Sequence, residues 1–197
     1  METHMENKKM LYSHVSVDCV LLGVNEDKLC VLLVERKVDK SDEKHYKLPG
    51  SLIYENEDLD TAAYRVFNEA TGLKRVPLKQ FRSFGSPSRT KNADDMQWLE
   101  NAMKLKIERI VTVAYLALSK IGRKSNPTNK YTSLAWFPVD SLPPLPFDHR
   151  EIIGAAVEEI REWVEKEPSI IFDYLPMKFT AFQLRRTYEI IYNKEMD

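Results

Sequence analysis

The sequence has little cysteine and no long apolar run. Its only two cysteines, Cys19 and Cys30, stand in apolar, β-branched stretches, where a free thiol behaves as a small buried hydrophobe. We therefore expect core residues rather than a disulfide or metal ligands. No stretch approaches the roughly 20 apolar residues that cross a bilayer, and the polar first ten residues lack the apolar segment of a signal peptide. These absences predict a cytoplasmic protein without a membrane partner.

An excess of either charge is also missing. The 197 residues contain 29 Lys and Arg against 30 Asp and Glu, a formal net charge of -1. No global basic field exists, so any contact with nucleic acid must come from a local patch. The apolar fraction of 43% with 30% charge is typical of a globular protein. The length suits one domain of about 100–150 residues with a smaller appendage.

Apolar, β-branched runs predict most of the strands. Residues 14–23 and 28–36 flank a short polar segment of the kind that forms turns, which predicts a hairpin. A short strand is expected before Tyr54, and three more at residues 78–84, 109–119 and 133–139. Residues 120–132 form a basic polar segment between the last two, which predicts a loop.

Helical spacing predicts four helices. One begins at Leu59 with a continuous apolar stripe and ends at Gly72. An inserted amphipathic helix is expected at residues 91–106, with Met96, Leu99 and Met103 along one side; it suits a lid, a dimer contact or a surface helix. Asp148 with Glu151 has the form of an N-cap with an acid three residues on, ahead of a long amphipathic helix that Pro168 ends, and Thr180 with Gln183 repeats the pattern ahead of a last helix.

The stretch from Gly50 to Leu73 resembles the Nudix box, G-x5-E-x7-R-E-U-x-E-E-x-G-U, where U is aliphatic. Counting back from Gly72 places Glu57, Arg65 and Glu69 on the first Glu, the Arg and a later Glu of that pattern. Leu48-Pro49-Gly50 precedes it. The resemblance implies an α+β Nudix fold, with a mixed sheet between helices.

The two other carboxylates of the helical part are replaced by Val66 and Ala70. In the family, the box collects oxygen ligands for divalent cations that hold a diphosphate and polarise water. Glu69 is the one helical carboxylate of the box that remains, and one carboxylate makes a poor magnesium site. Glu57 can instead pair with Arg65 or accept backbone hydrogen bonds. We therefore expect no metal, no cofactor and no catalysis, and a cleft that retains the capacity to bind a small polar ligand.

A second resemblance covers residues 147–156 and the segments around Leu175-Pro176, Gln183-Leu184 and Tyr188-Glu189. It is similar to the Nudix-related transcriptional regulators, in which a degenerate Nudix domain senses an effector and a C-terminal winged helix binds operator DNA, generally as a dimer. It implies a degenerate Nudix domain at residues 12–167 and the start of a winged-helix domain at residues 168–197, in a homodimer.

The resemblance implies two effector classes, ADP-ribose-like nucleotides and pentose sugars such as arabinose. A sugar requires groups that bind hydroxyls, whereas ADP-ribose requires cations or N–H groups for its diphosphate. By analogy with the fold, the cleft would be lined by Lys47, Glu69, Arg89 and His149. A purely structural interpretation is also open. In that case Lys47 only flanks a strand, and His149 only lies at a helix N-terminus.

Lys178, Arg185 and Arg186 provide a basic cluster for phosphate contacts with operator DNA, although such clusters also occur as solvated faces. The sequence stops at Asp197, soon after the last helix, so we expect a truncated DNA-reading surface. Two alternatives stay open. One is a Mg²⁺-dependent Nudix pyrophosphatase that uses Glu57, Glu69 and nearby acids such as Glu55, Asp58 or Asp60, and the other is an interaction module with neither ligand nor DNA.

Overall fold

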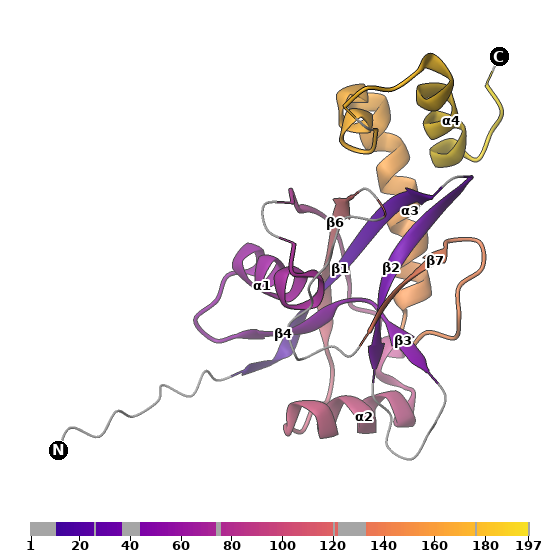
Figure 1. The fold of residues 1–197 in the computed structure, drawn as a ribbon. Coiled ribbons are helices and arrows are strands. Elements are labelled where there is room, and N and C mark those ends of the chain that lie inside the picture. Colours follow the sequence, from indigo (N-terminus) through magenta and orange to yellow (C-terminus); the bar gives the residue numbers. More distant parts are fainter. Residues whose placement is uncertain are drawn as a thin grey trace.

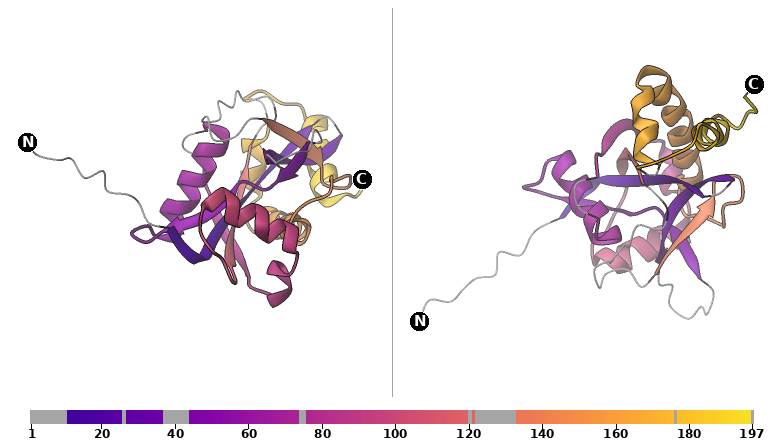
Figure 2. Two further views of the ribbon diagram at one scale, coloured as in Figure 1. Left: turned by 90° about the horizontal axis from the view of Figure 1, so that it is seen from below. Right: turned by 45° about the horizontal axis from the view of Figure 1, so that its top comes forward.

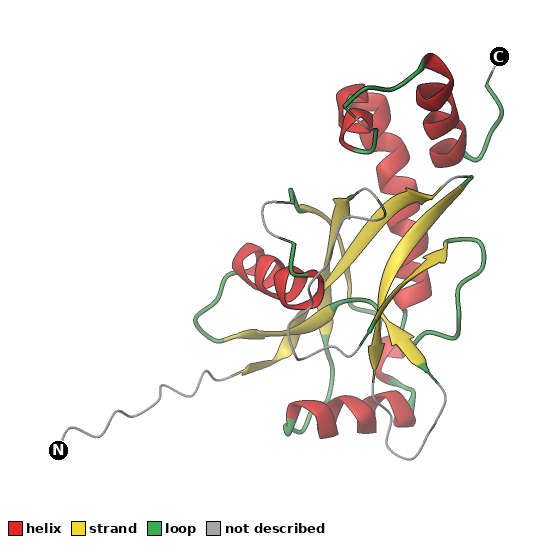
Figure 3. Ribbon diagram, viewed as in Figure 1, coloured by secondary structure: helices red, strands yellow, loops and turns green. Residues whose placement is uncertain are grey.

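The computed structural model describes residues 11–25, 27–36, 44–73, 76–119, 121, 133–175 and 177–196. Figure 1 shows a central sheet with helices around it, and Figure 3 distinguishes the two kinds of element by colour. The strands are β1 (Leu11–Asn25), β2 (Lys28–Arg36), β3 (His45–Lys47), β4 (Gly50–Tyr54), β5 (Lys79–Phe84), β6 (Val111–Leu118) and β7 (Leu134–Pro138). The helices are α1 (Leu59–Thr71), α2 (Ala93–Met103), α3 (His149–Lys166) and α4 (Ala181–Tyr192), with 3₁₀ turns η1 (Pro87–Thr90) and η2 (Pro168–Asp173).

The described strands form one mixed sheet in the order β3-β2-β1-β6-β5, with β4 on β1 and β7 on β2. The β1–β6 pair is parallel, whereas the other pairs are antiparallel. The predicted mixed sheet is therefore confirmed, as is the hairpin, whose register pairs Asn25 with Lys28. The predicted basic loop at residues 120–132 lies outside the described residues, apart from Ile121.

Alternate residues of β1 face two different cores, as the two-residue repeat of a strand requires. Val17, Cys19 and Leu21 pack with the apolar stripe of α1. Val20 and Leu22 pack with α3 in a second core. Helices α1 and α3 therefore cover opposite faces of the sheet, an arrangement that the two views of Figure 2 also show. Both cysteines are buried and free, as the sequence predicts.

Helix α2 lies at one end of the sheet, at the bottom of Figure 1. Its Met96, Leu99 and Met103 pack around buried Leu52, Ile107 and Ile110, which confirms the predicted apolar side. The polar side chain of Asn92 accepts a hydrogen bond from the Asp95 amide and so caps the helix.

The two predicted capping patterns have different outcomes. Thr180 and Gln183 form the expected capping box of α4. Asp148 stands at the N-cap position of α3, but its side chain makes no capping hydrogen bond. That prediction is corrected: the Asp148 carboxylate pairs with Arg89 instead, because a charged guanidinium competes well with a backbone amide for a carboxylate.

The C-terminal elements pack on the far end of α3, at the top of Figure 1. Ile170, Ile171, Ile190 and Ile191 are buried in the same core as Ile160 of α3. The proposed boundary near Pro168 coincides with the end of α3, but the residues beyond it share that helix's core. A winged helix at residues 168–197 stays a prediction. No helix in the described ranges is long and apolar enough to cross a membrane.

Candidate functional site

The segment that resembles the Nudix box forms a loop and the helix α1. Asp58 caps the helix by accepting a 2.7 Å hydrogen bond from the Thr61 amide. At the other end Gly72 has φ 68° and donates its N–H to Asn68. This left-handed conformation favours glycine because it lacks Cβ. The sequence therefore encodes both ends of the helix locally.

Glu57 and Arg65 form an ion pair between the loop and the helix. Arg65 donates from Nε and Nη2 to the two oxygens of Glu57, each at 2.7 Å, and Nη2 also donates to the Leu52 carbonyl. The Glu57 carboxylate also accepts the Tyr54 amide at 3.1 Å. The bidentate geometry uses both oxygens of Glu57, so its contribution here is to hold β4 against α1.

The residues of α1 do not fit a divalent cation. Val66 and Ala70 are 0% exposed and belong to the apolar face of the helix. Glu69 lies 3.8 Å from Arg65. Within the described part of the chain, no three or more His, Cys, Asp or Glu side chains gather as a metal site. A magnesium ion needs several oxygen ligands in octahedral geometry, and this box does not supply them.

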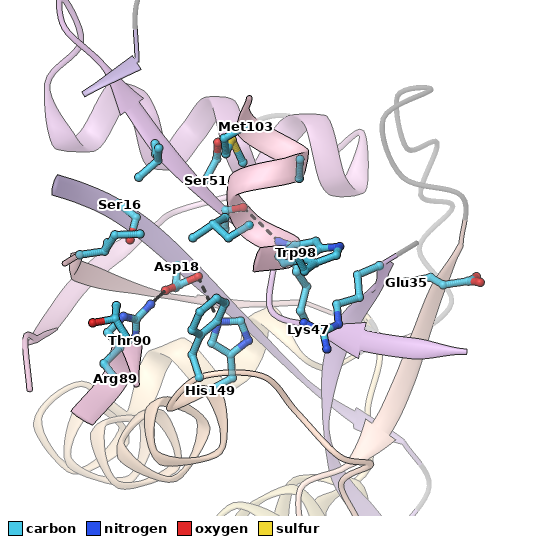
Figure 4. A pocket seen from close by; sticks show the side chains of 17 residues that line it. Ser16, Asp18, Glu35, Lys47, Ser51, Arg89, Thr90, Trp98, Met103 and His149 are labelled. Atoms are coloured by element: carbon cyan, nitrogen blue, oxygen red, sulfur yellow. Dashed lines mark hydrogen bonds and ion pairs between the residues drawn. The ribbon is translucent and has the colours of Figure 1, made fainter. Parts of the chain in front are cut away.

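A cavity of about 330 Å³ lies away from α1, between the sheet, α2 and the start of α3 (Figure 4). Its apolar lining comes largely from α2, and its polar side chains converge from β1, β2, β3, η1 and α3. The residues that line it are Ser16, Asp18, Glu35, Arg36, Lys47, Gly50, Ser51, Leu52, Arg89, Thr90, Trp98, Leu99, Ala102, Met103, Ile110, Phe147 and His149. An apolar pocket with a few convergent polar groups is typical of a small-molecule site.

Asp18 is the central carboxylate of the polar wall of this cavity. Its Oδ2 accepts from Arg89 Nη2 at 2.9 Å and from the Thr112 hydroxyl at 2.8 Å. Burial alone would raise the pKa of Asp18, but the Arg89 guanidinium and the hydrogen bond from Thr112 hold it below its ordinary value. A Cβ at position 50 would stand 1.9 Å from Oδ1, so the close approach of Asp18 requires Gly50.

Arg89 joins Asp18 to the start of α3. Its second terminal nitrogen, Nη1, pairs with Asp148. Burial raises the pKa of Asp148, against the lowering effect of Arg89. The Arg89 side chain is 5% exposed, so one buried cation compensates two carboxylates that belong to β1 and to the N-cap of α3.

His149 is uncharged and held in one tautomer. Burial lowers its pKa to about 3, although the Asp18 carboxylate acts in the opposite direction. The Leu48 amide donates to Nδ1 at 3.2 Å, so Nε2 carries the proton. That Nε2 lies 3.7 Å from Asp18 Oδ1, on the cavity wall.

Two further cations flank the Trp98 indole. Arg36 lies 5.0 Å and Lys47 6.0 Å from the ring centroid. Arg36 donates to Asp95 at 2.8 Å, while the Lys47 ammonium donates to the carbonyls of Leu48 and Gly50. Glu35, by contrast, points away from the cavity in Figure 4, and its carboxylate accepts from Ser133.

The structure brings together three of the four ligand-binding candidates named from the sequence. Lys47, Arg89 and His149 line the cavity, whereas Glu69 does not and lies beside Arg65 on α1. Sequence reasoning missed Asp18 and Arg36. The available signal for Asp18 was a single carboxylate within the apolar run of β1, since an unpaired buried charge is costly and rarely occurs without a partner.

The three DNA-binding candidates lie in or before α4. Lys178 is exposed. Arg186 pairs with Asp27 at 2.9 Å and with Glu189 at 3.1 Å, and Arg185 lies 3.7 Å from Glu189. Any phosphate contact by these arginines would therefore compete with carboxylates of the same chain.

The model of the NUDIX domain matches residues 12–156. Three solved structures are similar. A MutT/nudix family protein from Enterococcus faecalis shares 24% identity over 93% of this chain and 75% of that chain, with a TM-score of 0.71. Shewanella oneidensis NrtR complexed with a 27mer DNA shares 25% identity over 93% of this chain and 78% of that chain, with a TM-score of 0.68. The NUDIX domain of the same NrtR complexed with ADP ribose shares 27% identity over 76% of this chain and 89% of that chain, with a TM-score of 0.58.

No curated protein matches the chain. The similarity to NrtR confirms the resemblance to Nudix-related regulators that the sequence motifs indicate. Because the domain model covers 145 of the 197 residues (156 − 12 + 1), the match includes most of the chain. The chain belongs to the Nudix family.

Proposed function

We propose that this chain is an effector-responsive, DNA-binding transcriptional regulator in which the cavity beside α2 holds the effector. The observation that carries the proposal is the cavity itself, where Lys47, Arg89 and His149 converge around Asp18. The box on α1 contributes none of its residues to that lining and lacks two carboxylates. Ligand binding without hydrolysis is the function that this division supports.

The charges of the wall favour an uncharged effector that carries hydroxyl groups, such as a pentose. Three cations and three carboxylates meet there: Arg36 pairs with Asp95, Arg89 with Asp18 and Asp148, and Lys47 with backbone carbonyls. A diphosphate would meet cations whose charge these carboxylates and carbonyls already compensate. Sugar hydroxyls, in contrast, act as both donors and acceptors and fit a compensated polar wall.

An ADP-ribose-like effector is the second candidate, supported by the similarity to the NrtR domain that was crystallised with ADP ribose. DNA binding is proposed on the similarity to DNA-bound NrtR over 93% of the chain. A homodimer is proposed on the resemblance of the sequence motifs to the Nudix-related regulators. Lys178, Arg185 and Arg186 are the proposed phosphate contacts.

Isothermal titration of the chain with arabinose and with ADP-ribose tests the effector site. We expect binding that Ala102→Trp abolishes, because Ala102 lines the cavity and lies on the accessible side of α2. Gln97→Trp is the matched control, since Gln97 is exposed on the same helix and does not line the cavity. Equal binding by both variants would contradict the assignment. Rapid AMP release from ADP-ribose with Mg²⁺ would favour the hydrolase alternative.

Selection from a random duplex library tests DNA binding. A two-fold symmetric dimer predicts an enriched palindrome, and light scattering should give twice the 23.0 kDa of one chain. Changing Arg185 and Arg186 to Ala should weaken binding to every enriched sequence and reduce its salt dependence. Failure to enrich any sequence would refute the proposed DNA binding and leave only the proposed ligand site.

A further inference from the structure

Asp95 is a buried carboxylate that joins two parts of the cavity wall. Its side chain is 10% exposed, in the first turn of α2. Oδ1 accepts from Arg36 of β2 at 2.8 Å, and Oδ2 accepts from the backbone N–H of Phe147 at 3.1 Å. One side chain therefore connects β2, α2 and the segment that leads into α3.

The Phe147 backbone is in a conformation that its side chain disfavours. Its φ of 53° lies in the left-handed region, which Cβ makes unfavourable for residues other than glycine. The hydrogen bond to Asp95 stabilises this bend. Asp148 and His149 follow directly and open α3, so the bend determines where the helix begins and where its two polar side chains meet Arg89 and Leu48.

Arg36 retains a buried hydrogen-bond donor, Nε, that the described residues leave without a partner. Its Nε is buried and has no hydrogen-bond partner among the residues that the structure describes, and the same holds for the Ser16 hydroxyl. Both residues line the cavity, and Ser16 is 7% exposed. Buried donors without partners are costly and rare. Both of these belong to residues that line the same cavity, where a ligand oxygen would complete their hydrogen bonds.

The opposite end of α3 is attached to the C-terminal segment. Arg161 Nε donates to the Ile191 carbonyl at 2.9 Å, and the Tyr192 hydroxyl donates to the Arg161 carbonyl at 3.1 Å. Helix α3 has 18 residues, or about 27 Å at 1.5 Å per residue. Helix α3 therefore connects the cavity wall to α4, at the other end of the molecule (Figure 1).

We propose that Arg36 binds the ligand and that the hydrogen-bonded series Arg36–Asp95–Phe147 transmits occupancy of the cavity to the start of α3. The proposal rests on the proposed function in that the cavity is the effector site. A ligand oxygen that accepts from Arg36 Nε moves the guanidinium relative to Asp95. The hydrogen bond from the Phe147 amide to Asp95 then changes in geometry, and the conformation of the first turn of α3 changes with it. Occupancy can shift the protein between two states only because it changes these contacts.

Hydrogen exchange of the ligand-free chain tests the connection. We expect Asp95→Asn to accelerate exchange in residues 147–153 by about tenfold or more, because local opening there loses a charged partner. Arg36→Met, which perturbs the cavity end, should accelerate the same segment, and the double variant should add little to either change. Asp94→Asn is the control, since Asp94 is exposed beside Asp95. Exchange equal to wild type in both single variants would overturn the proposal, as would fully additive effects.

The same measurement with arabinose or ADP-ribose, whichever binds, tests the response to ligand. In the wild type, the bound probe should change exchange at residues 147–153. Asp95→Asn should still bind the probe, within about tenfold, and lose that change, whereas Asp94→Asn should retain it. A full response in Asp95→Asn would overturn the proposal. If neither probe binds the wild type, the proposed effector site fails, and the ligand-free comparison still decides whether the connection exists. If Asp95→Asn does not fold, Arg36→Met decides it alone.

Discussion

Replacing Arg89 with Met should destabilise the protein more than any other single change at the cavity. The Arg89 side chain is 5% exposed and pairs with Asp18, whose side chain is 6% exposed, and with Asp148. Methionine fills similar space but leaves two carboxylates without their cation. Removing one partner of a buried ion pair costs about 3–5 kcal/mol, a large part of the roughly 5–15 kcal/mol that holds a domain folded.

The size of this loss should depend on pH in a defined direction. In the wild type, the lowered pKa of Asp18 contributes stability that is present above the unfolded-state pKa and is lost as pH falls through the folded-state pKa. Without Arg89, burial raises the pKa of Asp18 and of Asp148, so both carboxylates take up protons at a higher pH than they do in the unfolded chain. The difference between variant and wild type should therefore be smaller at pH 5 than at pH 7.

Urea unfolding of wild type and variant at pH 7 and pH 5 measures both effects. Arg82→Met is the control, because Arg82 is exposed on β5, and it should stay within about 0.5 kcal/mol of wild type. Asp18→Asn should lower the free energy of unfolding by less than Arg89→Met, since Arg89 still pairs with Asp148 in that variant. A loss below 1 kcal/mol for Arg89→Met, or a loss that grows as pH falls, would refute the reasoning.

Three further predictions concern other parts of the molecule. His149 has a folded-state pKa near 3, so only the unfolded state takes up its proton between pH 7 and pH 5; this should cost about 2 kcal/mol over that range, and in His149→Gln the fall should be smaller by that amount. Millimolar Mg²⁺ should leave the melting temperature of the ligand-free chain unchanged, since the side chains of Val66 and Ala70 carry no oxygen; a clear rise would show that other carboxylates bind the metal. Thr180→Ala should cost about 1 kcal/mol in urea unfolding through loss of the α4 capping box, and an unchanged midpoint would mean that α4 unfolds separately.

The sequence predicted the elements that local chemistry defines. The turn after β1, the apolar stripe of α1, Gly72 and the Thr180 box are each specified within a few residues, and the structure confirms them. Asp148 was misread for the same reason. Its capping pattern is local, but its actual partner, Arg89, stands 59 residues earlier, and spacing along the chain carries no information about such a partner.

The sequence by itself determined that this is a Nudix fold with a box that lacks two carboxylates, because a motif is written in residue types and their spacing. It also named Lys47, Arg89 and His149, through resemblance. Only the tertiary structure decided that these three face one cavity, that Glu69 does not, and that Asp18 and Asp95 are the carboxylates that organise the wall. The physical reason is that charge compensation in a buried site depends on which distant strands and helices meet there, and that packing fixes those meetings.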